Sequence, residues 1–287
     1  MKITHSIAEY NAIHSALQRP AAPRLAFVPT MGALHEGHRS LIKLARSLGD
    51  VVVASIFVNP LQFGPGEDYA RYPRRLEDDL EVCEADGVDV VFVPTVTDLY
   101  PPGRQITVDA GALGMVLEGR SRPGHFNGVL TVVLKLFNIV RPQVAILGEK
   151  DAQQLACIQR MVGDLNIPIE IVGAPIIREP DGLALSSRNV FLTATERAIA
   201  RSLSAALEKA ATQTSVPSAR SAAYEVLDRA AAEPCFDLDY ATIVNPATFT
   251  EVPDDHVGPG TFVLAARVGS TRLIDNTVIN FTATPWT

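Results

Sequence analysis

The feature that most constrains this chain is an alternation of short apolar runs with amphipathic stretches over its first 175 residues. The runs are rich in β-branched residues and mostly lack the apolar–polar alternation of a half-exposed strand. Such runs are typical of parallel strands that are buried on both faces of a sheet. They occupy residues 25–29, 51–57, 88–93, 144–147 and 167–172.

The stretches between these runs carry apolar residues at helical spacing. Leu41, Leu44, Ala45 and Leu48 form one such stripe, and similar stripes lie within residues 76–83 and 129–140. Strands that alternate with helices build right-handed βαβ units. The sequence therefore predicts an α/β fold, with a Rossmann-like doubly wound parallel sheet in a domain of residues 1–175.

The pattern changes after residue 175, where we expect a smaller α+β domain of residues 176–287. Two alanine-rich helices are predicted at 194–211 and 219–232, joined by a link around Val216 and Pro217. Three β-like runs follow, and Gly269-Ser270 between the last two is typical of a hairpin turn. These runs span residues 238–244, 262–268 and 272–281.

The net charge and the cysteine content indicate the class of partner and the cellular compartment. A net charge of −7 gives no electrostatic footprint for nucleic acid or for an anionic membrane surface. The three cysteines are far apart and odd in number, which favours free thiols in a reducing compartment. Residues 1–19 contain Glu9 and no apolar core of a secretory signal. We expect a cytoplasmic protein without membrane or nucleic-acid partners.

A turn that contains two histidines follows the first of these strands and precedes a helix. Ligands of open parallel sheets lie at the carboxyl ends of strands, and a helix N-terminus offers unpaired N–H groups to phosphate. Gly32 and Gly37 let the backbone approach a ligand closely, and the imidazoles of His35 and His38 can donate hydrogen bonds. The turn at residues 30–38 is therefore a candidate phosphate site; the alternative is two histidines satisfied by neighbours in a polar loop.

Other catalytic motifs do not fit this turn. A zincin needs two residues between the glutamate and the second histidine, but only Gly37 separates Glu36 from His38. The chain also contains neither a P-loop motif nor the glycine fingerprint of dinucleotide-binding proteins. Zinc-protease, P-loop and dinucleotide chemistries are therefore excluded as interpretations of the turn.

Two further polar segments are candidates for phosphate binding. Lys150 follows a predicted strand and can meet a transferring phosphate as a point charge, while Asp151 favours the start of the next helix. The segment Ser186-Ser187-Arg188-Asn189 offers hydroxyls, amides and a guanidinium fork that suit pyrophosphate. The alternatives are a solvated capping cluster at Lys150 and an ordinary turn at 186–189.

Five segments together resemble the pantothenate synthetase family, which belongs to the H-x-G-H nucleotidylyl-transferase superfamily. The similarity runs from about residue 4 to residue 281, and the segments occur in the family's order. One such motif is weak support, whereas five in order are strong. They span residues 29–38, 57–63, 122–126, 148–151 and 185–189.

The resemblance implies a set of site residues. The family's catalytic groups correspond to His35, His38, Lys150 and Arg188. Its pantoate contacts correspond to Gln62 and Gln154, with Asn59, Tyr72, Arg122 and His125 lining the pocket; from the residues alone, the two glutamines are unremarkable amides. Its ATP contacts correspond to Met31, His35, His38, Gly148, Lys150, Asp151, Ile177, Ser186, Ser187 and Arg188.

The resemblance also implies Mg²⁺, a homodimer and a C-terminal domain that covers the active site. Asp78 and Asp79 match an acidic pair that the family associates with Mg²⁺. Neighbouring helix positions point in different directions, so a solvated helix face is the alternative. Val82 stands where some relatives carry a polar residue, which weakens the metal assignment.

The implied reaction joins pantoate to β-alanine. The pantoate carboxylate attacks the α-phosphorus of ATP and releases pyrophosphate, and the amine of β-alanine then displaces AMP from the pantoyl adenylate. The nearest alternative is an H-x-G-H transferase that stops at a nucleotide-linked product. A tRNA-charging enzyme and a binding protein with an inactive site are further alternatives.

Overall fold

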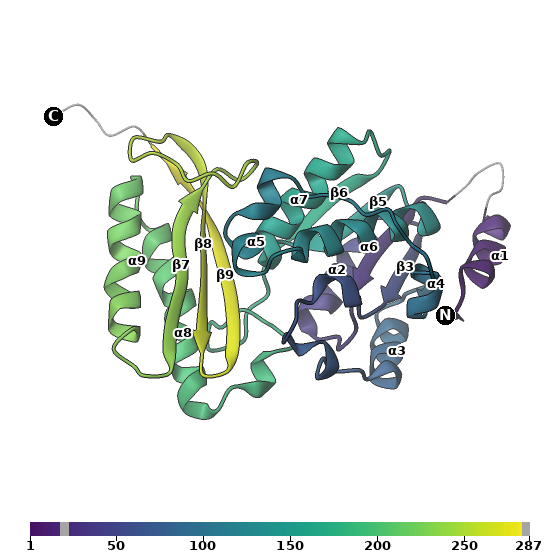
Figure 1. Ribbon diagram of the computed structural model, residues 1–287, viewed down its shortest axis with the longest axis horizontal. Coiled ribbons are helices and arrows are strands. Elements are labelled where there is room, and N and C mark those ends of the chain that lie inside the picture. Colours follow the sequence, from purple (N-terminus) through teal and green to yellow (C-terminus); the bar gives the residue numbers. More distant parts are fainter. Residues whose placement is uncertain (18–22, 283–287) are drawn as a thin grey trace. The chain divides into compact units, whose positions relative to one another are not determined.

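The computed structural model describes residues 1–17 and 23–282 (Figure 1). It divides into two compact units: Met1–Glu149 with Gln153–Pro175, and Lys150–Ala152 with Ile176–Thr287. Residues 18 and 19 of the segment searched for a signal, and residues 283–287 of the expected second domain, lie outside the described residues.

The first unit contains a six-stranded parallel sheet, which confirms the predicted fold class. The strand order is β1-β4-β3-β2-β5-β6. The sequence did not predict β1, a three-residue strand at the outer edge beside β4, because so short a strand carries no periodicity. The strand bounds are β1 Lys2–Thr4, β2 Leu25–Thr30, β3 Val51–Ile56, β4 Val90–Phe92, β5 Val144–Gly148 and β6 Glu170–Ala174.

Helices cover both faces of this sheet, as its apolar strands require. On β2, Leu25 and Phe27 join the core that includes Tyr10 of α1, most of α6 and part of α7. Ala26 and Val28 point to the other face, where α2 and α3 pack. The helices are α1 Ile7–Leu17, α2 Glu36–Leu48, α3 Leu76–Ala85, α4 Val96–Leu99, α5 Glu118–Ser121, α6 His125–Val140 and α7 Ala152–Asp164.

The strand order places a topological switch point beside β2. The chain passes from β2 to β3 on one side, whereas β5 pairs with β2 on its other side. Ligands of doubly wound sheets bind outside the carboxyl ends of the strands at such a point. The histidine turn follows β2, and Gly148 ends β5, so both lie at this edge of the sheet.

The second unit is a three-stranded antiparallel sheet packed against two helices. The strand order is β7-β8-β9, and β8 and β9 form a hairpin around Gly269, whose φ is +58°. The predicted second helix is wrong at its start, because Ser215 caps it and Pro217 lies in its first turn, where proline is favoured. The bounds are α8 Ala194–Ala211, α9 Val216–Ala230, β7 Phe236–Val244, β8 Gly258–Val268 and β9 Thr271–Phe281.

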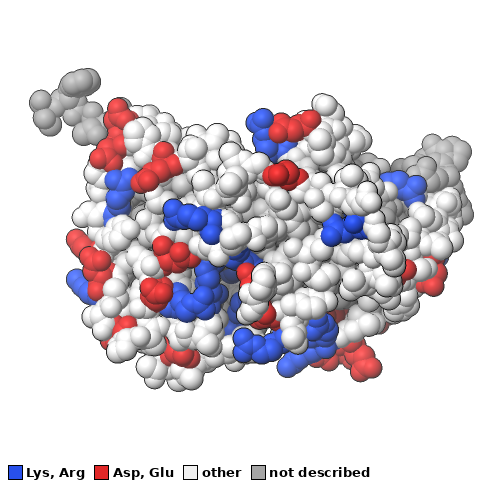
Figure 2. Space-filling model, in the orientation of Figure 1, with Lys and Arg blue, Asp and Glu red and all other residues white. Residues whose placement is uncertain are grey.

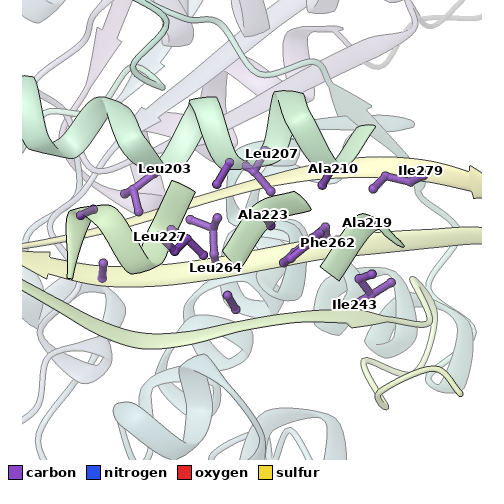
Figure 3. Packing of buried hydrophobic residues seen from close by; sticks show 14 of the residues in the cluster. Leu203, Leu207, Ala210, Ala219, Ala223, Leu227, Ile243, Phe262, Leu264 and Ile279 are labelled. Atoms are coloured by element: carbon purple, nitrogen blue, oxygen red, sulfur yellow. The ribbon is translucent and has the colours of Figure 1, made fainter. Parts of the chain in front are cut away.

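Small side chains let the two helices approach each other and the sheet. Figure 3 shows Leu203 and Leu207 of α8 and Leu227 of α9 directed toward Phe262 and Leu264 of β8. Alanines fill most of the other buried positions of the two helices, at Ala200, Ala206, Ala210, Ala219, Ala223 and Ala230. The alanine-rich pattern in the sequence is thus the packing face of this layer.

The cysteines are free thiols, and charges of both signs lie on the surface (Figure 2). Cys83, Cys157 and Cys235 are free, and burial raises the pKa of the first two to about 12. On the face drawn in Figure 2, basic and acidic side chains are interspersed among uncharged ones. No helix in the described part of the chain is long and apolar enough to cross a membrane.

Candidate active site

The two histidines of the turn cap the helix that they introduce. His35 is the N-cap residue of α2, and its Nδ1 accepts a hydrogen bond of 3.1 Å from the Gly37 amide. The Nδ1 of His38 accepts one of 3.3 Å from the His35 amide. Each ring therefore satisfies a backbone N–H group at the helix start, in the reciprocal arrangement of a capping box.

These caps determine which ring atoms can donate. An Nδ1 that accepts a hydrogen bond carries no proton, so the neutral ring of His35 or His38 carries its proton on Nε2. The ring centroids are 4.1 Å apart. The turn thus combines a helix N-terminus with two adjacent Nε2–H donors, an arrangement that suits an anionic oxygen.

The amide of Gln62 lies beside the same turn, in the segment that follows β3. Its Oε1 accepts a hydrogen bond of 3.0 Å from Nδ2 of Asn59, which leaves Nε2 as the donor end. That Nε2 lies 3.1 Å from Sδ of Met31. The structure therefore brings three of the expected site residues together and fixes the direction of the Gln62 amide.

Asn59 is held by groups from two other segments. Its Oδ1 accepts from the Tyr100 hydroxyl at 2.8 Å, and its Nδ2 also donates to the Gly128 carbonyl at 3.1 Å. A Cβ on Gly128 would lie 2.2 Å from the Leu61 carbonyl oxygen, so only glycine allows α6 to approach this closely. Asn59 acts on the site through Gln62, because its own polar atoms bond to protein groups.

Arg122 and His125 meet each other and the backbone of Gln62. The Nδ1–H of His125 donates to the Gln62 carbonyl at 2.8 Å, and its Nε2 accepts from Arg122 at 3.1 Å. Arg122 also holds the carboxylate of Glu67 through two hydrogen bonds of 2.8 and 2.6 Å. This pair lowers the pKa of Glu67. Through these contacts Arg122 and His125 hold the segment of Gln62 and Glu67 against the start of α6.

The pKa of His125 provides a test of this arrangement. Burial first, and then the charge of Arg122, lower it from 6.5 to about 4. The unfolded state thus binds the proton more tightly, and the neutral ring stabilises the fold above pH 6.5. We expect that contribution to fall by about 2 kcal/mol between pH 7 and pH 5.

Urea unfolding at several pH values measures this contribution. His125→Asn should lose stability at every pH but show a shallower decline toward pH 5 than the unchanged protein. His5→Asn is the matched control, since His5 is exposed. Equal slopes in the His125 variant and the unchanged protein would contradict the placement of a neutral ring here.

The remaining expected residues of the first unit are more dispersed. Tyr72 is buried, and its ring meets Phe63 edge-on at a centroid distance of 6.0 Å. Gln154 lies in the first turn of α7 and is partly exposed. Its neighbour Gln153 is buried and donates to the Leu113 and Val116 carbonyls, so this amide holds a loop.

Lys150 belongs to the second unit, although the sequence placed it in the first domain. Asn276 on β9 bonds to this segment, since its Nδ2 donates to the Lys150 carbonyl at 2.9 Å. The preceding residue of β9, Asp275, is buried and binds Arg178 through bonds of 2.6 and 3.1 Å. β9 therefore holds the backbone of Lys150 and the segment after Ile176.

The segment Ser186-Ser187-Arg188 forms a turn braced by Asn189. The Ser186 hydroxyl accepts from the Arg188 amide at 3.2 Å, and the Asn189 amide donates to the Ser186 carbonyl at 3.0 Å. Ile177 lies beside this turn, since its carbonyl accepts from the Leu185 amide. These expected ATP contacts lie close together, whereas Asp151 is an exposed residue of the helical turn at 149–151.

Asp78 and Asp79 do not converge on a common point where a metal ion could bind. Asp78 is exposed and lies 3.9 Å from Arg75, whereas Asp79 is buried and directs its oxygens at backbone amides. Mg²⁺ prefers octahedral coordination by oxygen atoms. Among residues 1–17 and 23–282 there is no group of three His, Cys, Asp or Glu side chains that could hold a metal ion. The two carboxylates therefore do not fit a protein-built Mg²⁺ site.

Comparison with known proteins decides the family. The model of the family described as Pantoate-beta-alanine ligase matches residues 2–278. The chain belongs to the pantoate-beta-alanine ligase family. It is 56% identical to the pantothenate synthetase of Thermobifida fusca (strain YX), over 96% of this chain and 94% of that protein.

Solved structures of the ligase family share the fold. The chain superposes on pantothenate synthetase from Thermus thermophilus with a TM-score of 0.89 and 47% identity, covering 96% of this chain and 99% of the other. The ligase from Francisella tularensis, complexed with beta-gamma ATP and beta-alanine, gives a TM-score of 0.81 at 38% identity, covering 97% of each chain.

Sequence reasoning missed several residues that hold the site of this ligase. Glu67, Tyr100 and Asn276 each bind an expected site residue or its backbone. Asp275-Asn276 gave a usable signal, because two adjacent polar residues in the middle of a strand point to opposite faces, so one of them faces the packed side. Glu67 and Tyr100 gave none, since their partners Arg122 and Asn59 are 55 and 41 residues away in the chain.

Proposed function

We propose that this chain catalyses its family's reaction by way of a pantoyl adenylate. Pantoate and ATP give the adenylate and pyrophosphate, and β-alanine then gives pantothenate and AMP. The observation that carries the proposal is the pair of capping histidines, His35 and His38, at the switch point of the sheet. A helix N-terminus with adjacent N–H donors is a general arrangement for binding phosphate. The identity of the acid and of the amine is inferred from the family.

The first step joins two anions and depends on positive charge. The pantoate carboxylate is ionised at neutral pH, so its attack on the α-phosphorus needs no general base. In-line attack needs the reactants held in place and the charge of departing pyrophosphate stabilised. We assign that stabilisation to His35, His38, Lys150 and Arg188. The other ATP contacts assigned are Met31, Gly148, Asp151, Ile177, Ser186 and Ser187.

Pantoate binding is assigned to the amides of Gln62 and Gln154. The Oε1 of Gln62 faces Asn59, so its Nε2–H groups are the donors for an oxygen of pantoate. Asn59, Arg122 and His125 act indirectly in this scheme, because they hold the Gln62 side chain and backbone. Tyr72 frames the same pocket.

The second step breaks the mixed anhydride. The uncharged amine of β-alanine attacks the acyl carbon, and the bond from that carbon to the phosphate oxygen breaks. AMP leaves with the electron pair, and the nitrogen releases one proton to the solvent as the amide forms. We further propose that Mg²⁺ enters with the phosphates of ATP, that the C-terminal unit covers the active site, and that the protein is a cytoplasmic homodimer. Mg²⁺ would neutralise phosphate charge when bound.

The order of the two steps gives a direct test. With ATP, Mg²⁺ and pantoate but no amine, we expect pyrophosphate up to about one equivalent per site, since a mixed anhydride survives only where water is excluded. Adding β-alanine should release AMP and the amide. Quenched-flow sampling with radiolabelled ATP measures the release of pyrophosphate and of AMP.

The alternatives give different products. Continuous ADP release would indicate an acyl phosphate and refute adenylation. A transferase that stops at a nucleotide-linked product would need no amine and would release no free AMP. A protein with an inactive site would give no products, and a failure to bind ATP would favour that alternative. A tRNA-charging enzyme would need tRNA as acceptor.

A further inference from the structure

Asp79 is a buried acidic residue whose carboxylate bonds to the histidine turn. It lies in the first turns of α3 and is 2% exposed. Its Oδ1 accepts from the Leu34 amide at 2.7 Å, and its Oδ2 accepts from the Ala33 amide at 3.0 Å. The two oxygens of one carboxylate thus hold two successive amides immediately before His35.

The backbone that Asp79 holds is in an uncommon conformation. Gly32 has φ of +79° and Ala33 has φ of +53°, so two successive residues are left-handed. A non-glycine residue adopts this region at a cost in free energy, and it persists where surrounding contacts maintain it. A Cβ on Gly32 would lie 2.7 Å from Oδ2 of Asp79, so the turn and the carboxylate fit each other closely.

The neighbouring acid lacks these contacts. Asp78 is exposed, and its carboxylate forms a long ion pair of 3.9 Å with Arg75. Burial raises the pKa of Asp79, while the amides of Leu34 and Ala33 act against that rise. Hydrogen bonds from two amides stabilise a carboxylate that would otherwise be costly to bury.

We propose that Asp79 is a positioning residue that fixes the turn at 32–34, and through it His35 and His38, and that it does not bind the metal. The proposal rests on the proposed function only in taking the two histidines to bind ATP. Asp79 would then support nucleotide binding whether or not Mg²⁺ is present.

Two variants separate positioning from metal binding. Asp79→Asn keeps the side-chain volume but directs an NH₂ group at one amide donor, and Asp78→Asn is its matched control. We expect Asp79→Asn to weaken binding of metal-free ATP, measured by calorimetry in EDTA, at least about tenfold. The Mg²⁺ concentration for half-maximal pyrophosphate release, and the KM for pantoate, should stay within about twofold. Asp78→Asn should match the unchanged protein in all three measurements.

Unaltered metal-free binding in Asp79→Asn, with a much higher Mg²⁺ requirement, would overturn the proposal. If neither the unchanged protein nor Asp78→Asn binds ATP, the proposed function fails instead. Amide exchange in the nucleotide-free protein tests the positioning role independently of activity. The Ala33 and Leu34 amides should exchange slowly in the unchanged protein and at least tenfold faster in Asp79→Asn; equal rates would overturn the proposal.

The unchanged protein provides a further test should Asp79→Asn fail to fold. Mn²⁺ without nucleotide is paramagnetic and broadens the NMR signals of nearby nuclei. A metal bound by Asp79 would erase the Ala33 and Leu34 amide signals, which arise within 3.0 Å of its oxygens. We expect those signals to broaden no more than amides elsewhere on the sheet; their selective loss would refute the positioning role.

Discussion

His38→Ala and Lys150→Ala should each fold normally and lose pyrophosphate release by a factor on the order of 10²–10³, which corresponds to about 3–4 kcal/mol in the barrier. Both side chains are proposed to face phosphate oxygens whose charge shifts as pyrophosphate leaves. Both are partly exposed and lie at a strand-to-helix turn, so truncation opens little cavity. The Lys150 change should cost about 1 kcal/mol of stability or less, and the His38 change about 1 kcal/mol because it removes a cap.

Chemically prepared pantoyl adenylate provides the control, because it bypasses the first step. Both variants should convert this intermediate with β-alanine far better than they use ATP. Equal slowness on both substrates would mean that the residues also serve amide formation. Undiminished activity with ATP would refute the assignment of the site to the histidine turn and Lys150.

Arg178→Met should lower the free energy of unfolding by about 3 kcal/mol, since it leaves the buried carboxylate of Asp275 without its partly exposed partner. Asp275 is 3% exposed and binds Arg178 through two hydrogen bonds. Thermal and denaturant unfolding measure the loss.

Two comparisons isolate the buried charge as the cause. Lys209→Met removes one partner of an exposed pair, in which Lys209 Nζ lies 2.6 Å from Glu225, and should cost about 1 kcal/mol or less. Replacing both members of the buried pair, as Arg178→Met with Asp275→Leu, should recover most of the loss because no charge remains buried. If Arg178→Met costs no more stability than Lys209→Met, water reaches the carboxylate of Asp275.

Much of the fold could be predicted because local patterns carry it. The run at residues 51–57 has no apolar–polar alternation, and the structure buries β3 on both faces. The alanine spacing of 194–211 matches the bounds of α8. The start of α9 could not be predicted in this way, because Val216-Pro217 is compatible with both a link and a first helical turn.

In the candidate site, too, residues that belong to a local pattern could be predicted, whereas those that depend on distant contacts could not. His35 and His38 could be identified because strand, turn and helix follow one another in the chain. The role of Asp79 could not, since it depends on amides 45 and 46 residues away, and its position beside Asp78 is equally compatible with a metal pair. The direction of the Gln62 amide depends likewise on Asn59 and, through it, on Gly128.

One dipeptide of β9 connects the stability of the second unit to its proposed chemistry. Asp275 holds Arg178 and Asn276 holds the Lys150 backbone, and β9 is an outer strand of its sheet. An outer strand has one paired neighbour, and proteins open locally in cooperative units whose free energies fall below that of global unfolding. A single opening of β9 would release both segments at once. The population of the closed strand therefore sets an upper limit on the fraction of molecules that hold Lys150 and the Ile177 segment ready for ATP.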